Sequence, residues 1–159
     1  MSEALQGEPV DDDDPLHRNL TYRIARVQAK LSAQGARLLK EKAGLSLTQW
    51  RIMKLIRTYG RANASALAKV STMDPGLFSR RLKTLIAQGY VQSTTDERDS
   101  RVQHLSLTPL GHRVYEKASP YMRARREWLR GLLTGTEQKA LFSALDKLDV
   151  GSERMDFSL

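Results

Sequence analysis

Residues 96–101 read Asp96-Glu97-Arg98-Asp99-Ser100-Arg101. This charged segment separates two short runs, residues 90–95 and 102–107, in which β-branched or alternating apolar residues are frequent. Two such runs on either side of a short polar segment predict a β-hairpin with a charged tip. The helices predicted before and after this hairpin therefore define the fold class.

An amphipathic helix is predicted directly before the hairpin. Asp74 can cap this helix, Pro75 occupies its first position, and Gly89 ends it. Its apolar residues recur at helical spacing: Phe78, Leu82, Leu85 and Ile86. The residues on or near the opposite, outward side are Gly76, Ser79, Arg80 and Lys83.

Two more helices are predicted upstream. A short helix begins at a cap provided by Asn63 or Ser65 and is followed by a tight turn at residues 71–73. The helix before it begins with Thr48 as its cap and ends at Gly60, and Leu47 and Ile52 are expected to form a hydrophobic staple. Its inward-facing residues are predicted to be Ile52, Leu55, Ile56 and Tyr59. Two helices separated by three or four residues and followed by a hairpin are typical of a winged helix-turn-helix.

Long helices are predicted on both sides of this region. One runs from residue 16 to about residue 43, where Gly44 ends it, with apolar residues spaced three or four apart at Leu20, Ile24, Val27 and Leu31. After the hairpin, Thr108-Pro109 begins a helix towards residue 133, and a capping box at residues 134–137 begins the last helix. We therefore predict a mainly α fold with a small β-hairpin wing. Residues 16–149 are expected to form one domain, between an acidic, disordered tail at 1–15 and a C-terminal tail at 150–159.

The charge of the chain is unevenly distributed. The formal net charge is +8, but residues 1–15 hold six acidic and no basic residues, and residues 131–159 hold five acidic and three basic ones. Residues 16–130 consequently carry a net charge of +16. Such a field attracts polyanions, so the expected partner is nucleic acid or, as a weaker alternative, an anionic membrane surface.

Several classes of function are disfavoured by the sequence. The chain has no cysteine, which excludes disulfides, thiolate zinc sites and thiol redox switches. No apolar run approaches the roughly 20 residues of a transmembrane helix, and the acidic start lacks the order of a secretory signal, so we expect a cytoplasmic protein. No glycine-rich phosphate loop or nucleophile motif is present in the sequence, so neither catalytic residues nor a cofactor are expected.

Four segments together resemble the MarR family of bacterial transcription regulators: Leu47-Thr48-Gln49-Trp50, residues 74–89, residues 96–101 and Leu107-Thr108-Pro109-Leu110-Gly111. The resemblance extends from about residue 16 to residue 149. It implies a homodimer whose first, fifth and sixth helices interlock and which binds a pseudo-palindromic operator in double-stranded DNA. It also implies that the helix from Asp74 enters the major groove while the wing reaches the adjacent minor groove.

The expected DNA contacts combine this resemblance with side-chain chemistry. A hydroxyl can meet a phosphate and a guanidinium can grip guanine, which points to Ser79, Arg80, Arg81 and Lys83 on the helix. Pro75 and Gly76, at the start of the same helix, are also predicted contacts. Which of Arg80 and Arg81 touches a base is left open. In the wing, Arg98 is the minor-groove candidate and Arg101 a second contact, while Asp96 and Asp99 are expected to brace the wing, one of them by holding Arg101. The alternatives are a solvated helix face and a surface ion-pair cluster worth little energy.

The resemblance to the MarR family also implies a pocket for a small ligand between the dimerisation helices and the DNA-binding part. The candidate residues are His17, Tyr22, Trp50 and Arg51, because aromatic walls with a few polar groups suit an aromatic acid. An ordinary core role for the aromatic residues is the alternative. The three histidines show no spacing that would place two ligands on one helix face, so no metal is expected.

These inferences predict a homodimeric DNA-binding regulator, a repressor, that an aromatic or phenolic acid releases from its operator. Three alternatives remain open: a regulator that senses an aromatic acyl-CoA thioester, a sequence-indifferent DNA-coating protein, and an adaptor that binds an acidic partner or a membrane surface.

Overall fold

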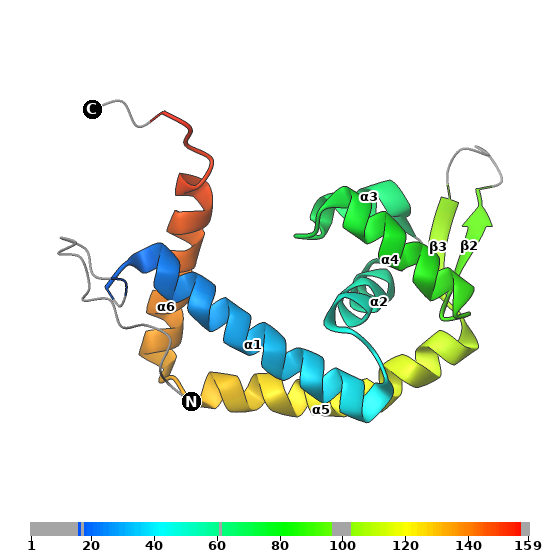
Figure 1. Ribbon diagram of the computed structural model, residues 1–159, viewed down its shortest axis with the longest axis horizontal. Helices are drawn as coiled ribbons and strands as arrows, with labels where there is room; N and C mark the ends of the chain where they lie inside the picture. Colours follow the sequence, from blue (N-terminus) through cyan, green and yellow to red (C-terminus); the bar gives the residue numbers. More distant parts are fainter. Residues whose placement is uncertain (1–15, 17, 61, 97–102, 157–159) are drawn as a thin grey trace, which may run out of the picture.

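The computed structural model describes residues 16, 18–60, 62–96 and 103–156. Its elements, in chain order, are α1 (Leu20–Ala43), α2 (Leu47–Tyr59), β1 (Ala62–Asn63), α3 (Ala64–Val70), α4 (Pro75–Ala87), β2 (Val91–Thr95), β3 (Gln103–Leu107), α5 (Pro109–Gly131) and α6 (Gly135–Gly151). In Figure 1, α2, α3, α4 and the strands form a lobe at one end, and α1 and α5 run side by side away from it towards α6. We call α1, α5 and α6 the arm. The predicted fold class, mainly α with a small hairpin wing, is confirmed.

The lobe is built around one apolar core. Its helices and strands contribute the buried residues Ile52, Met53, Ile56, Leu67, Phe78, Leu82, Leu85, Val91, Leu105 and Leu107. Leu39 of α1 and Tyr115 and Ala118 of α5 belong to the same core, so the lobe is packed onto one end of the arm. Since a close-packed core resists deformation, α4 and the hairpin are held on a firm base.

The small sheet contains one strand that the sequence does not predict. β1 pairs with β3 in antiparallel fashion, and the strand order is β1-β3-β2. A strand of two residues is too short to show the alternation by which strands are recognised. β2 begins at Val91, one residue later than predicted, and pairs with β3 from Val91 opposite Leu107 to Thr95 opposite Gln103.

Most of the predicted helix ends are confirmed. The side chains of Asp74, Thr108 and Thr134 each accept a hydrogen bond from the backbone N–H three residues further on. Gly44 and Gly89 follow α1 and α4 with positive φ angles of 67° and 70°, which glycine adopts without strain. Local sequence therefore determines most of the places where the helices start and stop.

The predicted cap of α2 is wrong. Ser46, and not Thr48, caps this helix: Gln49 N donates to Ser46 Oγ at 3.2 Å, and Ser46 N donates to Gln49 Oε1 at 2.9 Å. The reason is the residue three positions after each candidate. Ser46 is followed by a glutamine that can accept from the cap backbone, whereas Thr48 is followed by Arg51, which has no acceptor.

Replacing Ser46 with alanine should therefore destabilise the protein, whereas the same change at Thr48 should not. We expect Ser46→Ala to lower the free energy of unfolding by about 1 kcal/mol and Thr48→Ala to change it by less than about 0.5 kcal/mol. Urea denaturation followed by circular dichroism measures both variants. An equal loss in the two variants would contradict the assignment of the cap.

The ends of the first and last helices also differ from prediction. α1 begins at Leu20 and not at residue 16, because Asn19 caps it by accepting the N–H of Tyr22 at 2.9 Å. α6 continues to Gly151, so the first residues of the predicted C-terminal tail are helical.

Two residues predicted to face inward are exposed. Tyr59 is 56% exposed, because it is the last residue of α2 and lies beyond the packed part of that helix. Ile86 is 39% exposed and lies on the flank of the buried face formed by Phe78, Leu82 and Leu85.

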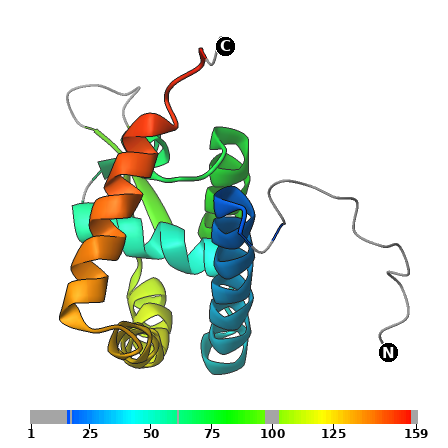
Figure 2. The same cartoon turned by 90° about the vertical axis from the view of Figure 1, so that its left-hand side faces the viewer.

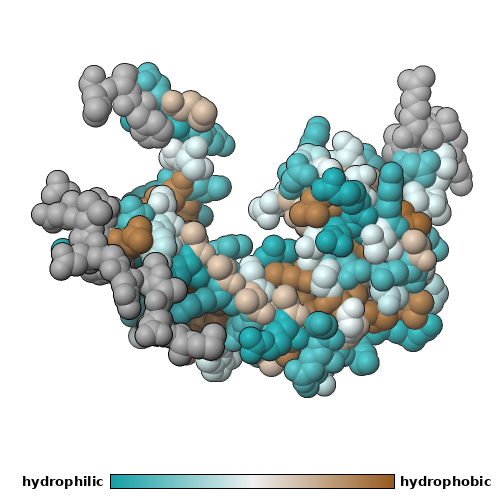
Figure 3. Space-filling view, in the orientation of Figure 1, coloured by the Kyte–Doolittle hydropathy of each residue, from teal (hydrophilic) through white to brown (hydrophobic). Residues whose placement is uncertain are grey.

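The arm leaves apolar side chains uncovered. α6 has no buried residue, and Figure 2 shows it standing apart from α1. Brown, hydrophobic side chains are visible on the α6 end of the molecule in Figure 3. The exposed apolar residues of α1 and α6 include Leu20, Ile24, Val27, Leu31, Leu141, Phe142, Leu145 and Leu148. Within the described residues, the arm thus has an apolar face with nothing packed against it.

Candidate nucleic-acid interface

α4 presents a basic outer face. Phe78, Leu82 and Leu85 are buried in the lobe core. At about 100° per residue, Arg80 projects nearly opposite them, while Arg81 projects to one side. All six residues predicted on this helix as DNA contacts are exposed: Pro75, Gly76, Ser79, Arg80, Arg81 and Lys83. The structure therefore brings them together on one accessible surface.

The cations of this surface are available to a partner. Arg80, Arg81 and Lys83 form no ion pair with any residue in the described part of the chain. Gly76 keeps the start of the helix open, since a Cβ at this position would lie 3.1 Å from Asp74 Oδ1 and 3.7 Å from Arg80 Nη1. A phosphate or a base edge can thus approach these three cations without breaking an ion pair with a described residue.

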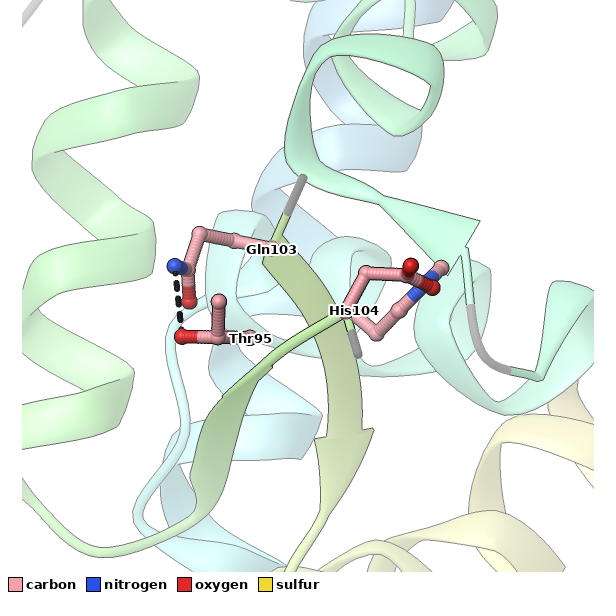
Figure 4. Close-up of polar contacts among 4 residues, drawn as sticks. Thr95, Gln103 and His104 are labelled. Carbon is pink, nitrogen blue, oxygen red and sulfur yellow. Dashed lines mark hydrogen bonds and ion pairs between the residues drawn. The ribbon is translucent and has the colours of Figure 1, made fainter. Parts of the chain in front are cut away.

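The base of the wing is held by polar contacts between its strands. Gln103 Nε2 donates to Thr95 Oγ1 at 3.0 Å, and this bond is dashed in Figure 4. His104 Nε2 lies 2.8 Å from Asp96 Oδ2, so Asp96 is anchored where β2 ends. The sequence did not identify His104 as its partner, because the pairing depends on strand register, in which His104 lies opposite Thr94. Arg98, Asp99 and Arg101 lie outside the described residues.

A stacked aromatic pair joins α2 to α5. The rings of Trp50 and Tyr115 are 4.4 Å apart and 8° from parallel, and both residues are buried. Arg57 lies 5.0 Å from the centroid of the Tyr115 ring and 2.8 Å from Glu116 Oε1. The aromatic stack, worth about 0.5–1.5 kcal/mol beyond its buried area, outweighs the exposed ion pair, worth about 0–1 kcal/mol. Burial raises the pKa of Tyr115, so its phenol is neutral at physiological pH.

Beside this stack lies a cavity of about 340 Å³, which we call the α2–α5 pocket. Trp50 and Lys54 of α2 line it on one side, and Tyr115, Ser119, Arg123 and Arg126 of α5 line it on the other. Only Trp50 among these residues was predicted to bind a ligand. In the sequence, the feature that could have pointed to this pocket is the basic run 123–126. Its link to α2 follows only from the packing of α5 against α2.

A larger and more apolar cavity of about 670 Å³, the α1–α6 groove, lies on the arm. Its lining includes Leu20, Ile24 and Leu31 of α1, Leu145 of α6, and the cations Arg23 and Arg51. The cavity volume is in the range of sites that hold small organic molecules.

The four predicted ligand residues are not brought together. Trp50 lines the α2–α5 pocket and Arg51 lines the α1–α6 groove. Tyr22 is exposed on α1 and lines neither cavity, and His17 lies outside the described residues. Among the residues that the structure describes, no group of acidic and histidine side chains is arranged to hold a metal ion. None of the described helices is long and apolar enough to cross a membrane.

Comparison with known proteins agrees with this geometry. Residues 45–102 match the model of the MarR family. An uncharacterised HTH-type transcriptional regulator of Bacillus cereus is 26% identical over 145 residues, covering 91% of this chain and 96% of the relative. A crystal structure of a MarR/EmrR family regulator from Acinetobacter sp. ADP1 is 25% identical, with a TM-score of 0.80, and covers 89% of this chain and 99% of its own.

Two further structures were solved with a bound partner. A mutant MarR from Escherichia coli, complexed with operator DNA, has a TM-score of 0.66 and 24% identity, covering 82% of this chain and 98% of its own. The organohalide-sensing regulator RdhR-CbdbA1625, in its 2,4-dichlorophenol-bound form, has a TM-score of 0.77 and 20% identity, covering 92% of this chain and 87% of its own.

A packed helix-turn-helix, an exposed basic second helix and a hairpin wing define a DNA-binding transcription regulator. The chain is similar to the MarR family in residues 45–102, and over most of its length it resembles HTH-type transcriptional regulators. Its relatives are transcription regulators and not enzymes, as the sequence predicted.

Proposed function

We propose that the protein is a homodimeric repressor that binds a pseudo-palindromic operator and is released by a small effector. The observation that carries this proposal is the uncovered apolar face of the arm. Its eight large side chains on α1 and α6 are 37–55% exposed. Soluble monomers rarely expose contiguous apolar surface of this kind, and a second copy of the same face can cover it with two-fold symmetry.

A two-fold dimer also suits the basic surface of α4. Two copies of α4 about 34 Å apart match successive major grooves on one side of B-DNA, so each lobe reads one half-site. We propose that Arg80 and its exposed neighbours on α4 enter the major groove. By the same proposal, Arg98 enters the adjacent minor groove, Arg101 makes a second contact, and Asp96 and Asp99 brace the wing.

For the effector, we propose an aromatic or phenolic acid held in the part of the α1–α6 groove that adjoins α2, because a second copy on the apolar face would cover the part lined by Leu20, Ile24 and Leu145. Leu47 offers an apolar contact to an aromatic ring there, and Arg51 offers charge-assisted hydrogen bonds to a carboxylate. The 2,4-dichlorophenol complex of a regulator with similar architecture supports a small aromatic ligand in this fold. An aromatic acyl-CoA thioester is the alternative effector. Tyr22 does not line this groove, and His17 lies outside the described residues, so the proposal does not depend on either residue.

Release follows from the position of this groove between the arm and α2. The two lobes can be spaced to match successive major grooves of DNA or spaced so that they do not match. A ligand that binds the mismatched arrangement more tightly lowers operator affinity, and the decrease is set by the difference between its affinities for the two arrangements. A difference of about 1–3 kcal/mol changes the affinity about 5- to 150-fold. A rigid displacement of each lobe is sufficient, and no unfolding is required.

The proposal is tested with labelled DNA from beside the protein's own gene. Fluorescence anisotropy should show binding that benzoate or 2,4-dichlorophenol weakens. Arg51→Ala should raise the benzoate concentration needed for half-release at least about tenfold, because a charge-assisted hydrogen bond is lost. Arg26→Ala, which removes an exposed cation of α1 outside the groove lining, is the matched control. Operator binding that both compounds leave unchanged at saturation would contradict release by an aromatic effector.

The same assay separates this function from sequence-indifferent DNA binding. Unlabelled operator should compete far better than unrelated duplex at physiological salt, whereas a DNA-coating protein would be displaced equally by both. We further propose that residues 16–149 constitute the regulatory domain and that the protein acts in the cytoplasm, where its DNA target lies.

A further inference from the structure

The α2–α5 pocket concentrates positive charge that no described residue neutralises. Lys54, Arg123 and Arg126 are all exposed, and none of them forms an ion pair within the described part of the chain. The two acids nearest in sequence do not change this. Glu116 pairs with Arg57, and Glu127, one turn after Arg123, makes no ion pair with a described residue.

Arg125 of the same basic run has a different role. Its Nε donates to Gln34 Oε1 at 2.9 Å and its Nη2 donates to the Leu31 carbonyl at 2.7 Å, so it fastens α5 to α1. Because Arg125 is occupied, the three remaining cations form the open part of the site. The hydroxyl of Ser119, which lines the same pocket, is a further donor.

The composition of this pocket selects among anionic ligands. A monocarboxylate would balance one of three cations, whereas a phosphate or diphosphate carries more charge and offers several acceptor oxygens. Arginine matches a phosphate through two parallel hydrogen bonds, and lysine serves as a point charge beside it. The cavity of about 340 Å³ is large enough for a phosphate group with a small organic substituent next to Trp50.

We propose that the α2–α5 pocket is a second effector site, separate from the α1–α6 groove, and that it binds the phosphate groups of a small organic phosphate. The proposal rests on the regulator function proposed above, to which it adds a class of ligand. Lys54 belongs to the lobe, whereas Arg123 and Arg126 belong to the arm. A bound phosphate therefore ties the lobe to the arm beside the Trp50–Tyr115 stack and fixes the orientation from which α4 meets DNA.

The sequence provides a direct reporter of this site. The chain has two tryptophans, Trp50 in the pocket and Trp128 outside its lining, so Trp128→Phe leaves Trp50 as the one tryptophan that reports on the site. The probes are inorganic pyrophosphate and ADP, with uncharged adenosine as the control for the base and ribose of ADP. Fluorescence titration of the full-length Trp128→Phe protein should give a saturable change with pyrophosphate and ADP and none with adenosine.

The variants then assign the response to named cations. Arg123→Ala with Arg126→Ala should weaken binding of both probes at least about tenfold, because charge-assisted hydrogen bonds are lost. Lys54→Ala removes the cation that α2 contributes to the pocket, and so tests the same site from the opposite side. The matched control is Arg113→Ala with Lys117→Ala, which removes two exposed cations from the same helix outside the pocket lining. The control should change binding less than about twofold, because screening limits the effect of distant surface charges.

Three results would overturn the assignment. They are the absence of a saturable change with pyrophosphate and ADP, an equal loss of binding in the control variant, and a loss of operator affinity in the Arg123/Arg126 variant far beyond that of the control. The last result would show that these cations contact DNA. Operator binding and its release by benzoate are measured on the same Trp128→Phe protein. If both persist while the phosphates do not bind, the second site is wrong and the proposed function stands.

Discussion

Ile24→Asp should convert the protein from a dimer into a monomer and abolish tight operator binding. Ile24 lies in the middle of the apolar stripe of α1 and is 40% exposed in the single chain. In a dimer that covers this stripe, the new carboxylate is buried opposite apolar side chains without a partner, which costs several kcal/mol. In the monomer the same carboxylate is hydrated, so the chain itself should remain folded.

The loss of DNA binding follows from the loss of the second lobe. In a dimer, the second half-site is bound at the high effective concentration set by the first, which is worth about 10²–10⁴ in affinity. Light scattering after size exclusion should report the 18.0 kDa of one chain for Ile24→Asp and twice that mass for the unmodified protein. Anisotropy should show the matching loss of operator affinity.

Ala33→Asp is the control for this change. It introduces the same charge into the same helix at an exposed position on the side away from the apolar stripe. This variant should remain dimeric and bind operator with a change of less than about tenfold. A folded Ile24→Asp protein that keeps the dimer mass would refute the α1 interface.

The sequence predicted the elements whose signals are local. Helical spacing identified Phe78, Leu82 and Leu85 as the buried face of α4, and the caps at Asp74 and Thr108 were correct because capping depends on residues within one turn. Tyr59 was misassigned because periodicity gives the side of a helix but not how far along it the packing partner extends. β1 depends on β3, which lies about 40 residues away in the chain, and no local pattern reveals that pairing.

The exposed surface of α4 was more predictable than the ligand cavities. All six predicted DNA contacts of this surface lie in one continuous helix that begins at Pro75, so their exposure is set by local geometry. Trp50 and Arg51 were grouped as one ligand site, but adjacent helix residues project about 100° apart, and the structure places them in different cavities. The α2–α5 pocket joins residues more than 60 positions apart in sequence, and its composition depends on how α5 packs.

The second large effect is expected on α4, where Arg80 and Arg81 should behave differently. Arg80 projects nearly opposite the buried face, and Arg81 projects to one side of it. In the binding mode proposed above, Arg80 would therefore reach base edges in the major groove, and Arg81 would meet the phosphates of one wall. Arg80→Ala should weaken operator binding by about 1–3 kcal/mol, about 5- to 150-fold, with a much smaller effect on random duplex DNA. Arg81→Ala should weaken binding to both DNAs similarly.

Salt dependence separates the two roles independently of affinity. Each phosphate contact that is lost lowers the slope of log K against log salt concentration by about 1, whereas a lost base contact leaves this slope nearly unchanged. Anisotropy titrations of both variants with operator and random duplex at four salt concentrations provide both quantities. Because both residues are exposed, neither variant should change the free energy of unfolding by more than about 0.5 kcal/mol. If Arg80→Ala lowers the slope and weakens both DNAs equally, Arg80 contacts the backbone and the base-reading role must move to Arg81 or another residue of α4.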